Sequence, residues 1–457
     1  MRILLAQPLG YLYTSGGAHK ANRLLMEGLA ARGHACRVLS PLSASESVKS
    51  RAELLAELAR RGVGLRQAPG GVEGYVLNGV EVRVTQNYLH QCAVLAGQVR
   101  EFRPDVVLVS EDTAHLMLGA ALEADPACVV YISHSATTLP FGPDNFCADE
   151  DKTRLLRQAR GMIAVSDYLT SYIGRWGGIE AETIRFPVYG RGPFPDLGRF
   201  GEGCVTLVNP CTMKGRSIFL ELARQSPEVE FAAVPTWGAV KEDLELIGDL
   251  PNVRVIPPSE NIDDVFRQTR VLLAPSLGGE AFGQIVVEAM LRGIPVLASN
   301  VGGLPEAKLG VDFLLPVTPI ERYEPLPGEQ VKVAYLPVIP EQDVRPWAEA
   351  LGRLVTDEDC YRRVSRQSRE AGLKFIAGLG FAPFEEYFER LGRARLKGRQ
   401  AGAADAPSGV KSVRREEASR QLVSNLPPDK RALLALKLKR SLTARAARPG
   451  GESCSQI

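Results

Sequence analysis

Short apolar runs alternate with longer amphipathic stretches through the first part of the chain. A short apolar run bounded by turn residues predicts a buried strand, and an apolar period near 3.6 residues predicts a helix. The pattern predicts strands at 2–6, 36–40, 105–110, 128–133 and 161–166, and helices at 18–32, 46–61 and 88–102. Residues 63–84 are predicted to form short strands with glycine-rich turns. Strands that alternate with helices favour a parallel, doubly wound α/β sheet.

The same alternation begins again after a segment without periodicity. Residues 184–203 contain three Pro and five Gly, which is typical of a linker. Beyond it, the pattern predicts strands at 205–209, 230–234, 252–256, 271–275 and 294–299, and helices at 215–225, 239–247 and 261–269. The proline-rich stretch 316–340 predicts an irregular excursion or a hairpin, and 345–396 predicts terminal helices. A second Rossmann-like domain is therefore expected.

These patterns set the predicted domain boundaries. At 457 residues the chain is too long for one ordinary core. We predict an N-terminal domain at 1–185, a linker at 186–203, a C-terminal domain at 204–374, terminal helices at 375–397 and a tail at 398–457. Two similar domains with a cleft between facing strand ends would suit an enzyme with two substrates that must exclude water.

The net charge differs in sign between residues 1–392, which are acidic, and the C-terminal residues, which are basic. From Arg393 onward there are 15 Lys and Arg against 5 Asp and Glu, whereas residues 1–392 hold 40 against 48. The tail is predicted to be largely disordered. A short cationic amphipathic helix is expected near residues 429–442, for docking to a protein partner or a membrane surface; the alternative is a solubilising end.

Several chemistries are disfavoured by missing patterns. The eight Cys show no C-x-x-C pairing and no His cluster at zinc spacing, so free thiols in a reducing cytoplasm are expected. No G-x-G-x-x-G follows the first strand, and no P-loop motif occurs. The D-E-D triplets at 149–151 and 357–359 are interpreted as solvated acids, and no metal is expected. Neither a secretion signal nor a membrane span is predicted, and nucleic-acid binding would rest on the tail alone.

One segment carries the strongest chemical signal. Residues 276–306 read SLGGEAFGQIVVEAMLRGIPVLASNVGGLPE, a predicted loop and helix between two buried strands. Glu280 is expected in the loop, whose free amides and helix dipole suit a phosphate. Glu288 is expected about two turns into the helix, where a carboxylate suits neutral hydroxyls such as those of ribose. The alternative is an ordinary helix-entry acid and an ordinary solvated helix residue.

The segment resembles the retaining GT-B glycosyltransferases of the family-four type, whose hallmark is two glutamates in the motif E-x7-E. The matching positions are Glu280, Ala281, Phe282, Gly283, Glu288, Ala289, Met290, Gly293, Pro295 and Val296. The resemblance extends over roughly 1–395 and implies two Rossmann-like domains whose parallel sheets face a central cleft. It also implies that the terminal helices cross back to the N-terminal domain.

The resemblance implies further donor-binding positions. Ser15, Gly16 and Gly17 match the small-residue loop that lies under the donor phosphates in the family. Asn300, Gly302, Gly303 and Glu306 match the family's next strand end. Ile256 would lie at the nucleotide base, which its backbone would hold.

Two positions are expected to act in catalysis with Glu280. His134 follows a predicted strand where the family often places a histidine near the donor sugar; the alternative is a buried structural histidine. His34 is interpreted as structural, and His19, His90 and His115 as surface or packing residues.

Lys214 matches the family's lysine at the donor diphosphate. Five residues earlier, Asn209 stands where the family commonly has arginine. Arg185 or Arg216 could supply the second cation; otherwise donor chemistry would be impaired.

The resemblance thus implies a glycosyltransferase that moves a sugar from a nucleoside-diphosphate sugar to an acceptor hydroxyl with retention of configuration. Glu280 would hold the sugar and Glu288 the ribose. A stretch near 426–434 is similar to segments beside condensation domains of assembly-line enzymes, which favours a natural product as acceptor; a glycan or glycolipid is the other expectation. The alternatives are a nucleotide-sugar epimerase, a phosphorylase, and a catalytically weak donor-binding partner of an assembly line.

Overall fold

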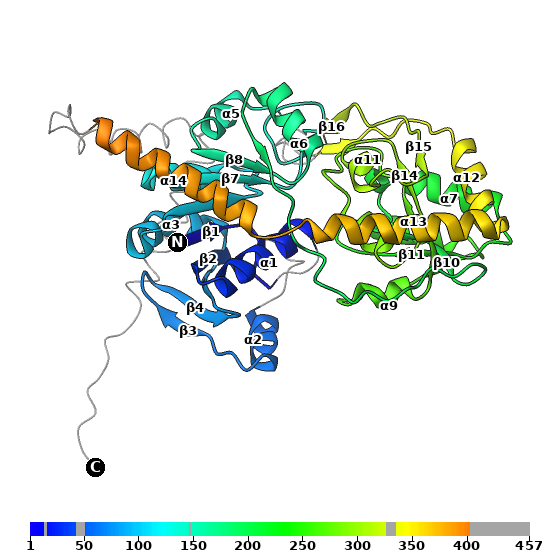
Figure 1. Ribbon diagram of the computed structural model, residues 1–457, viewed down its shortest axis with the longest axis horizontal. Helices are drawn as coiled ribbons and strands as arrows, with labels where there is room; N and C mark the ends of the chain where they lie inside the picture. The colour runs from blue at the N-terminus through cyan, green and yellow to red at the C-terminus, as the bar shows by residue number, and fades with distance from the viewer. Residues whose placement is uncertain (13–15, 43–50, 146–147, 326–334, 403–457) are drawn as a thin grey trace, which may run out of the picture. The chain divides into compact units, whose positions relative to one another are not determined.

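The computed structural model describes residues 1–12, 16–42, 51–145, 148–325 and 335–402 (Figure 1). Contacts group Met1–Arg395 into one unit, and Leu396–Ile457 into another. Within the first unit, the described strands form two separate sheets of six or more strands. Each sheet is built from the apolar runs of one half of the sequence.

The first sheet has the strand order β3-β4-β5-β2-β1-β6-β7-β8-β9. Its central strands are buried on both faces, which explains why they read as continuous apolar runs. The strands are β1 Arg2–Ala6, β2 Ala35–Pro41, β3 Arg66–Ala68, β4 Val72–Leu77, β5 Val80–Thr85, β6 Val106–Ser110, β7 Val129–Ser133, β8 Gly161–Ala164 and β9 Glu182–Thr183.

The helices of this half connect the parallel strands. Three of them begin at side chains that accept a hydrogen bond from the first turn: Asn87 from the amide of His90, Asp149 from the amides of Asp151 and Lys152, and Ser166 from the amide of Leu169. The helices are α1 Gly17–Ala31, α2 Arg51–Arg60, α3 Tyr88–Phe102, α4 Leu116–Ala124, α5 Glu150–Leu156 and α6 Asp167–Tyr172, with short turns at Pro126–Cys128 and Ile173–Gly177. The predicted start of the second helix, 46–50, lies outside the described residues.

The first sheet is not wholly parallel, in contrast to the prediction. β3 pairs with β4, and β4 with β5, in antiparallel register. Asn78 and Gly79 between β4 and β5 both have positive φ, 49° and 78°. A two-residue turn with two positive φ angles matches the twist of a hairpin, so this segment folds back instead of crossing over.

The second sheet is parallel, with the order β12-β11-β10-β13-β14-β15. β10 and β13 lie at its centre, where the strand order reverses, and ligands of such sheets bind at the carboxyl ends near that point. The strands are β10 Cys204–Val208, β11 Phe231–Val234, β12 Val253–Val255, β13 Thr269–Ala274, β14 Val296–Ser299 and β15 Leu314–Leu315.

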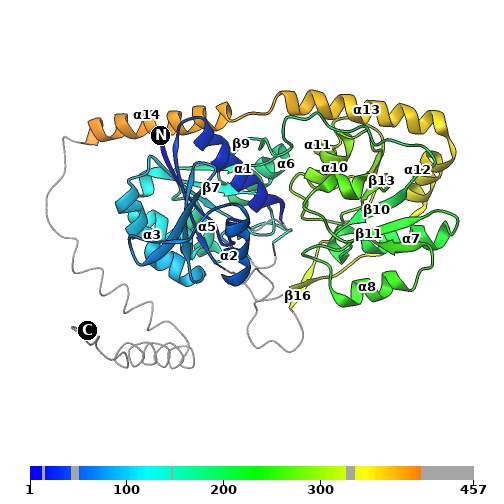
Figure 2. The ribbon, with the colours of Figure 1, turned by 90° about the horizontal axis from the view of Figure 1, so that it is seen from below.

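The helices of the second half flank this sheet, and α13 packs along the end of α10 near Gly372 and Leu291 (Figure 2). The helix predicted at 261–269 is shorter than expected, because Thr269 already belongs to β13. The helices are α7 Arg216–Gln225, α8 Lys241–Gly248, α9 Ile262–Phe266, α10 Gln284–Met290, α11 Leu304–Ala307, α12 Arg345–Thr356, α13 Glu358–Ala377 and α14 Ala382–Gly402, with a 3-10 turn at Thr212–Lys214.

The chain returns to the first sheet through α14. The phenol of Tyr387 donates to the carbonyl of Met162 in β8 (3.4 Å), and Glu385 accepts from Arg32 and approaches Nε2 of His34 at 2.7 Å. The amino group of Met1 lies 3.0 Å from Nδ1 of His34. The predicted boundary at 374/375 falls inside α13, since the break between the terminal helices comes after Ala377.

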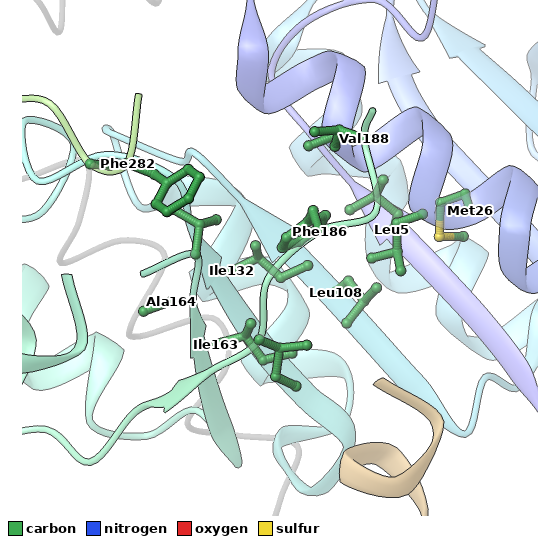
Figure 3. Packing of buried hydrophobic residues seen from close by; sticks show 14 of the residues in the cluster. Leu5, Met26, Leu108, Ile132, Ile163, Ala164, Phe186, Val188 and Phe282 are labelled. Carbon is green, nitrogen blue, oxygen red and sulfur yellow. The ribbon is translucent and has the colours of Figure 1, made fainter. Parts of the chain in front are cut away.

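The predicted linker 186–203 is partly core. Figure 3 shows Phe186 and Val188 among Leu5, Leu108 and Ile132 of the first sheet. Phe186 is 5% exposed, and its ring contacts the ring of Phe384 in α14 at a centroid distance of 4.8 Å. The segment lacks periodicity because its apolar residues fill the space beside a sheet instead of forming an element.

Two terminal predictions remain. The proline-rich stretch 316–340 contains the antiparallel strands β16 Tyr323–Pro325 and β17 Tyr335–Pro337, in agreement with the hairpin alternative. Of the predicted tail 398–457, residues 398–402 belong to α14, and the rest, with the predicted amphipathic helix, lies outside the described residues. In the described part of the chain, no helix combines the length and the apolar character needed to cross a membrane.

Candidate active site

Glu280 and Lys214 meet at the carboxyl end of the second sheet. The ammonium of Lys214, in the turn after β10, donates to Oε2 of Glu280, in the loop after β13. The hydroxyl of Ser276 donates to the same oxygen at 3.3 Å. Both charged side chains keep some exposure, 28% for Lys214 and 18% for Glu280. The two residues predicted to act at the donor sugar and the diphosphate are therefore brought together as an accessible ion pair.

Two glycines fix the loop that carries Glu280. A Cβ atom at Gly302 would lie 2.3 Å from the carbonyl oxygen of Glu280, and one at Gly303 would lie 2.2 Å from that of Ala281. The amide of Gly303 also donates to the carbonyl of Glu280 at 2.7 Å. The absence of a side chain at these two glycines therefore allows the loop of Glu280 and Ala281 to approach closely.

Ala281 and Phe282 anchor the same loop by burial. The carbonyl of Ala281 accepts from the hydroxyl of Ser166 in the other half of the unit. The ring of Phe282 is 7% exposed and stacks on that of Phe375, with centroids 5.8 Å apart. Gly283 has φ 95°, a value that favours glycine, and it begins α10. The side chains of Ala281 and Phe282 are therefore buried within the protein.

Glu288 makes a contact that the sequence did not predict. Its Oε1 accepts from the ammonium of Lys20 in α1 at 2.9 Å, and its side chain is 12% exposed. The interpretation as an ordinary solvated residue is therefore wrong. Lys20 is in the first turn of α1, where the helix dipole disfavours a cation. That unfavourable position marks Lys20 as unusual in the sequence, although it does not point to Glu288 as its partner.

The glycine loop before α1 approaches α10, the helix that carries Glu288. Gly16 precedes α1 in extended conformation, and a Cβ at Gly17 would lie 3.2 Å from Oε1 of Gln284. Ser15 lies outside the described residues. The loop after β1 and the start of α10 are thus close neighbours.

His134 is at the carboxyl end of β7, and it is a neutral side chain. Burial, with a smaller contribution from His19, lowers the pKa of His134 to about 3. Its Nε2 lies 2.8 Å from Oδ1 of Asn22, whose amide nitrogen donates to Ser110 at 3.0 Å. Oδ1 is therefore the acceptor, so Nε2 of His134 carries the proton. Nδ1 is left as a lone-pair acceptor without a partner among the described residues.

Glu111 was missed by the sequence interpretation. It follows β6 with φ 55°, and its Oε1 accepts from the amide of His134 at 2.8 Å. Burial raises its pKa to about 7, and the hydrogen bond from His134 opposes that rise. Glu111 directly follows β6, and His134 directly follows the neighbouring strand β7. This shared position at the strand ends was the available signal for Glu111.

The other histidines are packing residues. Burial lowers the pKa of His19 to about 4, so the surface alternative is wrong for it. His115 is 2% exposed and stacks on Tyr131, with centroids 6.1 Å apart. His90 is half-buried, and its Nδ1 accepts from the amide of Gln86 at 3.3 Å.

Asn209 has a buried side-chain amide of which only the oxygen has a hydrogen-bond partner among the described residues. The residue is 5% exposed and adopts φ 62°. Its Oδ1 accepts from the amide of Gly238 at 3.0 Å, whereas Nδ2 has no partner among the described residues. Arg185 is held by Glu306 and Asp167, and Arg216 is held by Asp243. Neither arginine is free to act as the second cation in this arrangement.

Ile256 and the acidic triplets complete the list of predicted positions. The amide of Ile256, just after β12, donates to the carbonyl of Ala233 at 2.9 Å, and its side chain is buried. Asp149 and Asp357 accept hydrogen bonds from the first turns of α5 and α13. Among the described residues, no group of three or more His, Cys, Asp or Glu is placed to hold a metal ion.

The comparisons with known proteins agree with this arrangement. Two parallel-sheet domains whose strand-end loops contact each other define the GT-B class. The family described as "Glycosyl transferase 4-like domain" matches residues 16–188, and "Glycosyl transferases group 1" matches 216–322. The chain belongs to the GT-B glycosyltransferases of this group 1, family-four type.

Curated relatives match parts of the chain. The D-inositol 3-phosphate glycosyltransferase of Corynebacterium jeikeium is 27% identical over 207 residues, which cover 42% of this chain and 44% of the relative. The protein of the same name from Streptomyces scabiei is 49% identical over 57 residues, 12% of this chain and 13% of the relative. The matched region spans less than half the length of either relative.

Solved structures share the fold over most of the chain. Sucrose-phosphate synthase from Thermosynechococcus elongatus superposes with a TM-score of 0.60 at 16% identity, covering 89% of this chain and all of that one. HepE from Anabaena, in complex with UDP and glucose, gives 0.58 at 18% identity, covering 85% and 99%.

Proposed function

We propose that the protein transfers a glycosyl group from a nucleoside-diphosphate sugar to an acceptor hydroxyl, with retention of configuration and without a metal ion. The observation that carries the proposal is the meeting of Lys214 and Glu280 at the carboxyl edge of the second sheet, with Glu288 on the following helix. A cation and two carboxylates at such an edge suit a ligand that has both phosphates and hydroxyls.

The present ion pair suggests how the donor is accommodated. A diphosphate carries more negative charge than Glu280, so it would draw the ammonium of Lys214 to itself. Glu280 would then be free to accept hydrogen bonds from the sugar hydroxyls. Charge that develops on the leaving diphosphate would be stabilised by Lys214 and by the loop amides near Phe282 and Gly283.

Retention follows if the acceptor attacks from the face that the diphosphate leaves. The bond from the anomeric carbon to the diphosphate oxygen breaks, the bond to the acceptor oxygen forms, and the acceptor proton passes to the departing diphosphate. No covalent enzyme intermediate is needed. His134, neutral and with Nδ1 as an acceptor, would orient a hydroxyl of the sugar or the acceptor.

The acceptor is proposed by class only: a natural product, a glycan or a glycolipid. The name of the curated relatives adds a phosphorylated inositol to the compounds worth testing. A HepE structure in complex with UDP-glucose makes this nucleotide sugar the first donor to test.

The experiment is a panel of UDP-, GDP- and dTDP-sugars, with and without candidate acceptors, in which released nucleotide is measured. Acceptor-dependent release of a nucleoside diphosphate is expected, with a product of the donor's anomeric configuration by proton NMR. Donor binding without turnover by any acceptor would favour the weak, donor-binding alternative. Acceptor-independent conversion of the sugar would favour an epimerase.

A further inference from the structure

The turn after β11 carries an exposed tryptophan at the sheet edge that bears the site. Trp237 is 65% exposed, whereas Trp347 is fully buried. It lies inside a turn that is closed by a hydrogen bond from the amide of Ala239 to the carbonyl of Thr236, at 3.1 Å. β11 lies between β10 and β12, so this turn lies between the ends of the strands that carry Asn209 and Ile256.

The turn is held in place from two sides. The amide of Gly238 donates to Oδ1 of Asn209, and a Cβ at Gly238 would come within 3.0 Å of that amide group. On the other side, the amide of Val240 donates to Asp243 at 2.8 Å, and Asp243 is the buried partner of Arg216. These contacts hold the turn that carries the indole in one position. Arg216 contributes indirectly, through its ion pair with Asp243.

The surroundings of Trp237 are apolar on one side and polar on the other. Val240, in the same loop, and Val255, at the end of β12, are also exposed, at 55% and 48%. On the side of this turn toward β10, the sheet edge carries Nδ2 of Asn209. This buried donor has no partner among the described residues. Beyond it, toward β13, lies the ammonium of Lys214. Along the sheet edge the order is aromatic surface, neutral donor, cation.

We propose that Trp237 is the platform on which the nucleobase of the donor stacks, and that Nδ2 of Asn209 donates to the diphosphate beside it. The inference rests on the proposed function, and it names the side chains that would hold the two ends of the nucleotide. An aromatic face binds a planar base whatever its identity, and an amide donor followed by a cation suits phosphate oxygens. A nucleoside diphosphate has these groups in the same order as the sheet edge.

The test compares the binding of UDP, GDP, ADP and inorganic pyrophosphate to the full chain by titration calorimetry. In W237A, the nucleoside diphosphate that binds the wild type best should bind about 10- to 100-fold more weakly, while pyrophosphate binding is unchanged. W237F should retain most of the affinity, because phenylalanine keeps an aromatic face. The matched control is W176F, since Trp176 is also exposed, at 46%, but follows α6 in the other half.

Asn209 is tested by N209D, which keeps an acceptor oxygen for Gly238, replaces the free donor with a carboxylate oxygen and so also brings a negative charge to the site. We expect about a 10- to 100-fold loss for both the nucleotide and pyrophosphate. Intrinsic fluorescence gives a second measurement: the nucleotide should quench emission in the wild type and in W176F, but much less in W237F. Melting temperatures of all variants establish that the fold is intact.

Unchanged nucleotide affinity in W237A would overturn the inference and leave the proposed function standing. So would a wild type that binds pyrophosphate as tightly as the nucleotides, because the base would then contribute nothing. A loss confined to the KM of the acceptor would assign Trp237 to the acceptor and overturn the inference too. If the wild type binds no nucleoside diphosphate and transfers no sugar, the proposed function itself fails.

Discussion

The two sheet edges of this protein hold their polar groups in opposite ways. At the second sheet, Glu280 and Glu288 are paired with the ammonium groups of Lys214 and Lys20, and the side chains stay partly exposed. At the first sheet, His134 is buried and Glu111 is partly buried, and desolvation favours the uncharged form of both. The first kind of edge can exchange its partners for a charged ligand. The second kind offers preset neutral donors and acceptors.

The largest loss of activity is expected from removing the charge of Lys214, at the carboxyl edge of the second sheet. Lys214→Met keeps the apolar stem and removes the charge that would stabilise the leaving diphosphate. We expect kcat for sugar transfer to fall by about 100- to 1000-fold, the range seen when one preorganised donor is lost. Steady-state nucleotide release measures it. Lys241→Met is the control, since Lys241 is an exposed lysine paired with Glu245 on α8; equal losses in both variants would contradict the assignment.

Glu280→Gln separates the sugar from the nucleotide. The amide is a poorer acceptor for sugar hydroxyls, so the affinity for the nucleoside-diphosphate sugar should fall about tenfold. The affinity for the free nucleoside diphosphate should stay the same or rise slightly, because Lys214 loses its competing carboxylate. Titration of both ligands into the wild type and the variant tests this. A parallel loss for both ligands would show that Glu280 acts on the phosphates or the loop.

The buried edge predicts a pH dependence of stability. The folded pKa of His134 is about 3 and the ordinary value is 6.5, so between these values the unfolded chain binds more protons. Stability is therefore lost as the pH falls below 6.5, by at most about 1.4 kcal/mol per pH unit for this group. Urea unfolding at several pH values should show a shallower acid decline for His134→Gln. Identical slopes would mean that His134 is not buried as a neutral side chain.

Glu111 works in the opposite direction and is the control for that experiment. Its folded pKa of about 7 lies above the ordinary 4.5, so the folded state binds the extra proton between these values. Its contribution to stability is present below 4.5 and is lost as the pH rises through 7. Glu111→Gln should therefore steepen the acid decline between pH 4.5 and 6.5, while His134→Gln flattens it.

The smallest effect is expected from Arg185, which the sequence offered as a second diphosphate cation. It is paired with Glu306 and Asp167, and such partly exposed pairs contribute about 0–1 kcal/mol. Arg185→Gln should change the free energy of unfolding by no more than that, and should leave donor KM nearly unchanged. Denaturant titration and initial rates measure the two quantities. A large rise in donor KM would instead indicate that Arg185 binds the donor diphosphate.

The sequence predicted the features that repeat along the chain or that lie in one segment. Strand and helix positions followed from apolar periodicity, and the loop and helix that hold Glu280 and Glu288 followed from one continuous motif. Contacts between distant segments could not be predicted. Lys20 and Glu288 are 268 positions apart, and nothing in either local sequence links them.

Turn geometry and burial were the other limits. The antiparallel β3–β5 segment depends on two positive φ angles, which the glycine-rich pattern suggested without giving the direction of the strands. Phe186 was assigned to a linker, because a residue that packs from irregular backbone leaves no periodic trace. Glu111 was overlooked because its raised pKa depends on desolvation in the folded protein, which the local sequence does not show.

We propose that the carboxyl edge of the second sheet binds a nucleoside diphosphate, with Glu288 at the ribose. The most direct measurement is calorimetric titration of wild type and Glu288→Gln with UDP, GDP, ADP and dTDP. We expect saturable binding of at least one nucleotide to the wild type, and an affinity at least about tenfold lower in the variant. Equal affinity in the two proteins, or no binding of any nucleotide to the wild type, would contradict it.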